Sequence, residues 1–262
     1  MTIQNDNNPY LLRFNNGVVD FNKKKLRDIS TKDKLTKSTK INYIPLDRTR
    51  DAVVIAEIEE FIETLFPTKF QRDYMWEHFA SILIGVNLNS KIHMYAGIGS
   101  KGKGVLTDLL TQCLGDYCSD IPPSIITEPR DNFGEASPDL IALNGVRLAL
   151  VHEPPVGDTI NNGALKQLTG VEPIEGRHLF SAPVTFLPQC KVIVTSDNIM
   201  KVEDDIKADL NKIVATEFDT LLTDYPGYDE RVYEKFPKWR EVFMAMLVDI
   251  AFSLQGKVNN TP

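Results

Sequence analysis

The fold of this chain is decided by the stretch Tyr95-Ala-Gly-Ile-Gly-Ser-Lys-Gly-Lys-Gly-Val105. It matches the pattern GxxxxGK of a phosphate-binding loop, in which glycines let backbone N–H groups point at a phosphate. The positive N-terminus of a following helix faces the same anion. The alternative is a glycine-rich turn that binds nothing. We predict a nucleotide site made of the following residues: Gly97, Ile98, Gly99, Ser100, Lys101, Gly102, Lys103, Gly104 and Val105.

The residues around this loop predict an α/β domain. Ile92–Ala96 is expected to be a strand that enters the loop, and 105–114 a helix that leaves it. Arg147–Val151 is a continuous apolar run, typical of a strand buried on both faces of a parallel sheet. Further strands are expected at 184–187, 191–195 and 213–216, and a closing helix at 242–254. This alternation predicts three layers, with helices on both faces of a parallel sheet.

The first part of the chain has a different pattern. Two short apolar runs flank Asn15-Asn16-Gly17, which is a hairpin signal. Apolar residues at helical spacing then predict helices over 51–66 and 70–84. We therefore expect a small, mostly helical N-terminal domain with a β-hairpin over residues 1–88, followed by the P-loop ATPase domain over 89–262.

Composition narrows the class of protein. The chain has 262 residues, and 42% hydrophobic and 25% charged residues are ordinary for a soluble globular protein. No apolar run approaches the ~18 residues of a membrane span. Three cysteines without a CxxC pair, and the lack of a secretory signal, predict an intracellular protein.

The charge of the chain is unevenly distributed. A net charge of −7 argues against a globally basic nucleic-acid-binding coat, but it leaves room for a local basic path. The segment 23–40 carries eight Lys or Arg against two Asp. Its simplest interpretation is a solvated loop or hairpin.

Two further strand ends carry chemistry that suits a nucleotide. Glu153 follows the apolar run 147–151, where the acid of a Walker B element would coordinate Mg²⁺ or polarise the attacking water. His152 stands where many ATPases have a second acid. Asp197 and Asn198 follow the predicted strand 191–195 and are expected to act as a sensor, although an ordinary turn explains them too. Gly104 departs from the motif, which has Ser or Thr there to hold Mg²⁺.

Together these elements resemble a known family. The order of the glycine-rich loop, "NGVRLALVHEP", "LKQLTGVEPIEGRHLF" and "FLPQCKVIVTSDN" is similar to the superfamily 3 helicases of large DNA viruses and phages, the poxvirus primase–helicase type. The N-terminal segment also resembles the region that precedes the ATPase in that family. The resemblance implies an AAA+ fold, a hexameric ring, ATP and Mg²⁺ as cofactors, and movement along single-stranded DNA.

The resemblance also implies roles for single residues. Lys103 matches the Walker A lysine and Glu153 the Walker B acid. Lys166, Gly170 and Arg177 match the third motif, which supplies a DNA-directed hairpin, although Val171 and Glu172 replace its usual Gly and Asp. The DNA-binding residues expected from this motif are Lys166, Arg177 and His178. Asp197 takes the place of the sensor asparagine, with Asn198 next to it.

The site of the arginine finger departs from the family. The corresponding stretch, 205–218, offers Lys212 instead of arginine. We expect no primase domain before Met1 and no winged-helix segment after Pro262; the alternative is that this sequence is a fragment of a longer primase–helicase.

We therefore expect an ATP-dependent DNA helicase or translocase that acts in the replication of a virus or mobile element. Expected partners are single-stranded DNA, further copies of the chain and a primase or other replication protein, in the host cytoplasm or nucleus if the source is viral. The main alternative is a degenerate nucleotide-binding scaffold with little or no hydrolysis. A P-loop kinase is a third possibility, but no lid arginines support it.

Overall fold

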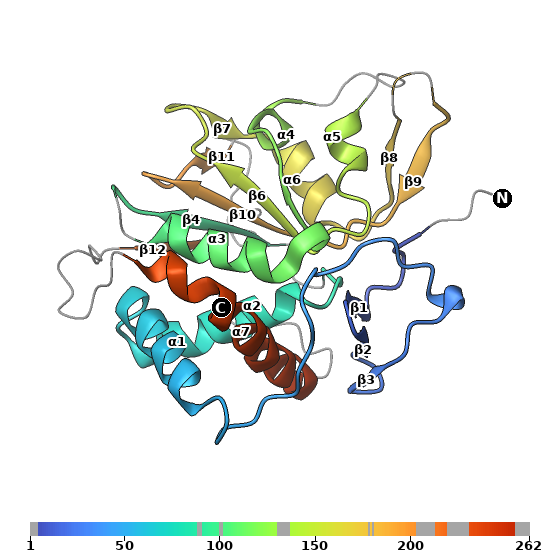
Figure 1. Ribbon diagram of the computed structural model, residues 1–262. Helices are drawn as coiled ribbons and strands as arrows, with labels where there is room; N and C mark the ends of the chain where they lie inside the picture. The colour runs from blue at the N-terminus through green and yellow to red at the C-terminus, as the bar shows by residue number, and fades with distance from the viewer. Residues whose placement is uncertain are drawn as a thin grey trace.

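The centre of the protein is a five-stranded parallel β-sheet, shown by a computed structural model (Figure 1). The structure describes residues 5–87, 91–99, 102–129, 137–177, 179, 181–202, 213–218 and 231–254. The strand order is β12-β4-β10-β6-β5, and each of these pairings is parallel. The strands are β4 (Ile92–Ala96), β5 (Cys118–Asp120), β6 (Leu148–His152), β10 (Lys191–Ser196) and β12 (Ile213–Glu217).

Helices cover both faces of this sheet, so the predicted three-layer α/β fold is confirmed (Figure 1). Alternate strand residues enter two separate cores: Leu150 and Ile193 belong to one, Val151 and Val194 to the other. The first core is covered by α1 (Ala52–Leu65), α2 (Lys69–Ile82), α3 (Lys103–Leu114) and α7 (Val232–Leu254). The second is covered by α4 (Ser124–Thr127), α5 (Pro138–Ile141) and α6 (Asn162–Thr169).

The N-terminal region combines a small antiparallel sheet with α1 and α2. Its strands are β1 (Leu11–Phe14), β2 (Gly17–Asp20) and β3 (Lys25–Arg27), followed by the 3₁₀ helix η1 (Thr31–Asp33). The predicted hairpin is confirmed, and β3 adds a strand that the sequence did not indicate. Apolar side chains of β1, β2, α1 and α2 share one core with α3 and α7. The domain boundary near residue 88 stays a prediction.

Two sequence-based assignments need correction. The expected strand 184–187 is β9 (Val184–Phe186), which pairs antiparallel with β8 (Ile174–Gly176) and lies outside the central sheet. Helix α7 begins at Val232, because Phe236 and Trp239 continue its buried stripe towards the N-terminus.

The remaining short elements are η2 (Gly115–Tyr117), β7 (Thr159–Ile160) and β11 (Lys201–Val202).

Candidate nucleotide-binding site

The predicted phosphate-binding loop connects the carboxyl end of β4 to the start of α3. Its first residue is tied to the neighbouring strand, since Gly97 N donates to the Ser196 carbonyl at 3.1 Å. Gly99 and Gly102 have φ angles of 78° and 86°, a region that residues with a Cβ rarely adopt. Glycine at these two positions therefore allows the loop to turn back towards the helix. Ile98 is exposed, whereas Ser100 and Lys101 lie outside the described residues.

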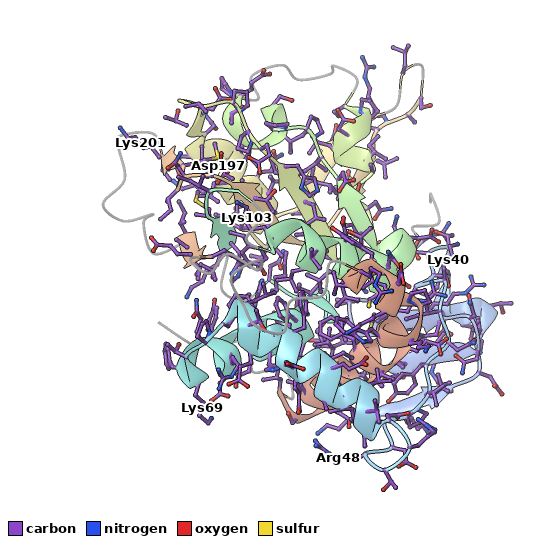
Figure 2. The ribbon with its side chains drawn as sticks, turned by 60° about the vertical axis from the view of Figure 1, so that its left-hand side comes forward. Lys40, Arg48, Lys69, Lys103, Asp197 and Lys201 are labelled. Atoms are coloured by element: carbon purple, nitrogen blue, oxygen red, sulfur yellow. The ribbon has the colours of Figure 1, made fainter. Side chains whose placement is uncertain are left out.

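Lys103 is the first residue of α3, and its side chain is only 7% exposed. Its ammonium group donates to the carbonyl oxygen of Gly97 and lies 3.8 Å from Asp197 Oδ1. Figure 2 shows Lys103 and Asp197 near one another at this end of the sheet. An ammonium group has three N–H donors, yet in the described part of the chain Gly97 is its single hydrogen-bond acceptor. The structure thus holds a buried cation with spare donors at a helix N-terminus.

Gly104 and Val105 form the first turn of α3 after the lysine. Gly104 is exposed, and a Cβ built there would meet no heavy atom within 4 Å. A serine or threonine side chain would therefore fit without displacing a neighbour. Val105 is half-buried and packs against the core, so it anchors the turn and offers no polar group.

Glu153 lies directly after β6, at the same edge of the sheet as the loop. Its side chain is exposed, and its φ of 43° lies in the left-handed region. That conformation costs a non-glycine residue about 1 to 2 kcal/mol. It is held because Glu153 N donates to the Thr195 carbonyl of β10 at 2.9 Å. The fold thus keeps an unburied carboxylate at the strand tip in a strained backbone position.

Asp197 and Asn198 follow β10, the strand between β4 and β6. Both side chains are exposed, and only Asp197 contacts Lys103. The turn is fixed by Ser196, whose hydroxyl donates to the Asn198 carbonyl at 2.6 Å. The loop, Lys103, Glu153 and Asp197 are therefore brought to one edge by three adjacent parallel strands.

A hydrogen-bonded chain across three strand ends was not predicted. His152 Nδ1 lies 3.1 Å from Thr195 Oγ1, and His152 Nε2 lies 3.3 Å from Asp120 Oδ1. The sequence placed His152 beside Glu153 but gave no partner for it. Asp120 could have been found as the polar end of β5, had that short strand been recognised. These two hydrogen bonds fix the orientation of the His152 ring, next to Glu153.

The predicted DNA-binding residues lie elsewhere. Lys166 is exposed on α6. Arg177 follows β8 and is half-buried, and its backbone N–H donates to Ser137 Oγ at 3.4 Å. Strands β8 and β9 do form a hairpin, on the side of the molecule away from the tips of β4, β6 and β10 (Figure 1). His178 and Lys212 lie outside the described residues. The structure therefore separates the hairpin from the phosphate-binding loop.

Metal ligands at this edge are few. In the ranges that the structure describes, no group of three or more His, Cys, Asp or Glu side chains could hold a metal ion. Glu153 directly follows β6, and Asp197 lies 3.8 Å from the ammonium group of Lys103. A magnesium ion would need oxygen ligands from a bound phosphate in addition to Glu153.

Comparison with known proteins agrees with the resemblance seen in the sequence. A family model described as "D5 N terminal like" matches residues 2–67. "Putative helicase L207/L206" of Acanthamoeba polyphaga mimivirus is 28% identical over 259 residues, which are 93% of this chain and 27% of that protein. "Putative helicase 121R" of Invertebrate iridescent virus 3 is 28% identical and covers 82% of this chain and 23% of its own length. This chain resembles proteins named as helicases in large DNA viruses.

A solved structure supports the fold. The apo structure of the NrS-1 C-terminal region (305–718) superposes with a TM-score of 0.62 at 15% identity, covering 86% of this chain and 51% of that one. The chain spans about a quarter of the length of the two viral relatives and about half of this neighbour. A likeness at this identity concerns the fold alone. Among the described helices, none has the length and apolar character needed to cross a membrane.

Proposed function

We propose that this chain binds ATP through the loop between β4 and α3. The position of Lys103 carries the proposal, because its buried ammonium group lies at a helix N-terminus and, among the residues that the structure describes, donates one hydrogen bond, to Gly97. Phosphate oxygens are the acceptors that such a group lacks, and the helix dipole favours the same negative charge. The left-handed Gly99 and Gly102 leave the loop backbone free to approach a phosphate closely.

Magnesium would enter this site with the nucleotide. Glu153 is exposed at the tip of β6 and would hold the ion directly or through water. The ion would neutralise charge that develops on the phosphates. Gly104 offers no hydroxyl ligand, so the metal would depend on phosphate oxygens, water and Glu153.

The full activity that we propose is ATP-driven movement on single-stranded DNA during replication of a virus or mobile element. The names of the viral relatives support this function. We propose that Arg177, which directly follows β8 of the β8–β9 hairpin, and Lys166, on α6, contact the strand, together with His178. Superfamily 3 helicases work as rings, so we propose a hexamer in which Lys212 of one subunit faces the nucleotide of the next. A primase or another replication protein would act with it in the host cytoplasm or nucleus.

A second candidate is a nucleotide-binding scaffold that hydrolyses ATP slowly or not at all. Two observations favour it: Gly104 has no side chain, and Asp197 places a carboxylate 3.8 Å from the ammonium group that the phosphates need. A negative charge beside Lys103 competes with the nucleotide for the same cation.

ATP turnover with and without single-stranded DNA separates these functions. The helicase proposal expects turnover that DNA stimulates and that Glu153→Gln removes. The matched control is Glu59→Gln, which neutralises an exposed acid on α1. ATP binding without turnover, in the presence of DNA, would favour the scaffold. Absence of both binding and turnover would contradict both candidates.

The ring and the hairpin need separate measurements. Light scattering with a slowly hydrolysed ATP analogue and DNA should show oligomers that increase with concentration, and a strict monomer would count against the ring. Lys166→Ala with Arg177→Ala should weaken binding to single-stranded DNA and its salt dependence. Lys69→Ala with Lys238→Ala, on α2 and α7, is the matched control. Unchanged binding would assign Lys166 and Arg177 to folding.

A further inference from the structure

The N-terminal sheet carries a concentration of positive charge that the proposed ATP site does not use. The segment 23–40 holds eight of the 29 Lys and Arg of the chain but only two of its 36 Asp and Glu. Five exposed members define what we name the lysine surface: Lys23, Lys24, Lys25, Lys32 and Lys34. The whole chain has a net charge of −7, so the positive charge of this segment is opposite in sign to that of the protein.

The fold holds these lysines together. Lys25 and Arg27 are two residues apart on β3 and share one face of the strand, whereas Leu26 between them packs against the core. Both terminal nitrogens of Arg27 donate to the carboxylate of Asp33 at 2.8 Å, so η1 is fixed to that face. Lys32 and Lys34 flank Asp33 in the sequence, so this ion pair holds the segment that carries them against β3.

Most of this charge is not neutralised. Lys23 lies 4.0 Å from Asp20 and remains 63% exposed. Arg27 pairs with Asp20 and with Asp33, so these two carboxylates are already engaged by an arginine. In the described part of the chain, Lys24, Lys25, Lys32 and Lys34 make no ion pair. A lysine on an edge strand such as β3 can serve to block pairing with another sheet. That role would not account for Lys32 and Lys34, which lie outside any strand.

The surface also lacks what a single-stranded nucleic acid needs. Proteins that bind single strands combine positive charge with exposed aromatic rings on which bases stack. Phe21 is the one aromatic residue of the segment 21–40, and it is buried with 6% exposure. Flexible cations without aromatic rings suit the regular phosphate backbone of a duplex, which needs no base contacts.

We propose that the lysine surface docks double-stranded DNA through its phosphates. The inference rests on the proposed function, because it assumes that the protein acts on DNA, but it names a second form of DNA at a different site. The N-terminal sheet lies on the side of the molecule away from the tips of β4, β6 and β10 (Figure 1), and Lys40 of the same segment lies far from Lys103 and Asp197 (Figure 2). A duplex bound there leaves the phosphate-binding loop open.

The test compares two variants of equal charge change in the full chain. The surface variant is Lys23→Gln, Lys25→Gln and Lys32→Gln, all exposed and with ordinary backbone angles. The control is Lys69→Gln, Lys201→Gln and Lys238→Gln, exposed lysines of α2, β11 and α7. Fluorescence anisotropy would measure binding of a labelled DNA duplex, and of one of its strands, without nucleotide, between about 50 and 200 mM salt.

We expect wild type to prefer the duplex, and the surface variant to bind it at least about tenfold more weakly. The slope of log affinity against log salt should fall by about three, since each lost phosphate contact removes about one. The control and a Lys→Arg version of the surface variant should bind like wild type. The proposal is overturned if wild type does not bind duplex, if control and surface variants lose affinity equally, or if the single strand binds more tightly than the duplex.

A measurement of ATP binding on the same variants distinguishes failure of the proposed ATP site from failure of the proposed duplex site. The surface variant should bind a fluorescent ATP analogue like wild type, because its residues lie far from the loop. Loss of duplex binding with normal ATP binding supports the lysine surface. A wild type that binds duplex but no ATP would contradict the proposed function while leaving the lysine surface intact.

Discussion

Charged side chains gather at both ends of the central sheet, but they are buried at one end and partly exposed at the other. At the amino ends of β6 and β10, Arg147 and Lys191 are 1% and 6% exposed. At the carboxyl ends, Glu153 and Asp197 are exposed, and only Lys103 is buried. The two ends come from the same strands, so the difference reflects what surrounds each group.

At the amino end, the protein itself supplies the partners. Arg147 donates to the side chain of Gln189 and, at 3.2 Å, to the carbonyls of Asn8 and Leu11. Lys191 donates to the Val86 carbonyl at 2.9 Å and to Asn87 Oδ1 at 3.2 Å. Burial lowers the pKa of Arg147 to about 10 and that of Lys191 to about 8. Buried cations with internal acceptors tie the N-terminal segment to the sheet.

At the carboxyl end, the described residues supply fewer partners and the backbone is strained. Within the described ranges Lys103 has one hydrogen-bond acceptor, Gly104 leaves open space, and Glu153 adopts a left-handed conformation. Unsatisfied donors and strain cost stability, and they persist where function requires them. The buried cations with internal acceptors at the amino end serve stability, and our proposal assigns ligand binding to the carboxyl end.

The largest effect is expected from Arg147→Ala. It removes a buried guanidinium and leaves Gln189 and two carbonyls without their donor, so the free energy of unfolding should fall by about 3 to 5 kcal/mol. Lys103→Ala is the matched control and should cost about 1 kcal/mol or less, because one hydrogen bond is lost. Urea unfolding followed by circular dichroism measures both. Equal losses would erase the contrast between the two ends.

Gly104→Ser should change turnover and leave the fold intact. The new hydroxyl has room and would add a ligand for Mg²⁺, so ATP hydrolysis should rise about a hundredfold. Gly104→Ala is the control, since it changes the backbone propensity in the same direction without an oxygen. Steady-state ATPase assays distinguish them. If wild type already turns over at about 10 s⁻¹ and serine adds nothing, the metal site works differently.

The histidine pair near the amino end should make stability depend on pH. His78 of α2 and His93 of β4 stack with ring centroids 3.6 Å apart, near Tyr74, Tyr95, Lys91 and Lys191. Burial and the charge of Lys191 lower the pKa of His78 to about 3. Burial, then His78, Lys191 and Lys91, lower the pKa of His93.

The unfolded chain therefore takes up protons first as the pH falls below about 6.5. Stability is present above that pH and is lost between about 6.5 and 3, by roughly 1 kcal/mol per unit for His78. Urea unfolding at pH 7 and 5.5 measures the loss, and His78→Gln should reduce it. An unchanged pH dependence in that variant would show that His78 does not contribute.

Glu153→Gly should give the smallest effect, a gain in stability. Glycine adopts the left-handed φ of 43° without the cost that glutamate bears, so unfolding should require about 1 kcal/mol more. Glu172→Gly, at another exposed acid without a positive φ, is the control and should not stabilise. Thermal unfolding compares the two. A loss of stability in Glu153→Gly would show that the strained turn needs the glutamate side chain.

The sequence predicted long, regular features best. The spacing of Val54, Ile58 and Phe61 indicated α1 to within a residue or two, and Gly97 to Lys103 indicated the loop. Short strands such as β3 and β5 were missed, because three residues carry too little periodicity. Partners across the fold could not be seen either. Nothing in the sequence distinguished Arg147, which is buried, from a surface arginine, because its acceptors come from residues far away along the chain.

Our central claim is that the buried ammonium group of Lys103 binds a phosphate of ATP. The most direct test measures ATP binding to wild type and to Lys103→Ala. Isothermal titration or a fluorescent ATP analogue would measure the dissociation constant, with thermal unfolding as a check on folding. We predict that wild type binds and that the variant binds at least about a hundredfold more weakly, with a melting midpoint lowered by no more than about 4 °C. Equal affinity in the two proteins, or no binding by folded wild type, would contradict the claim.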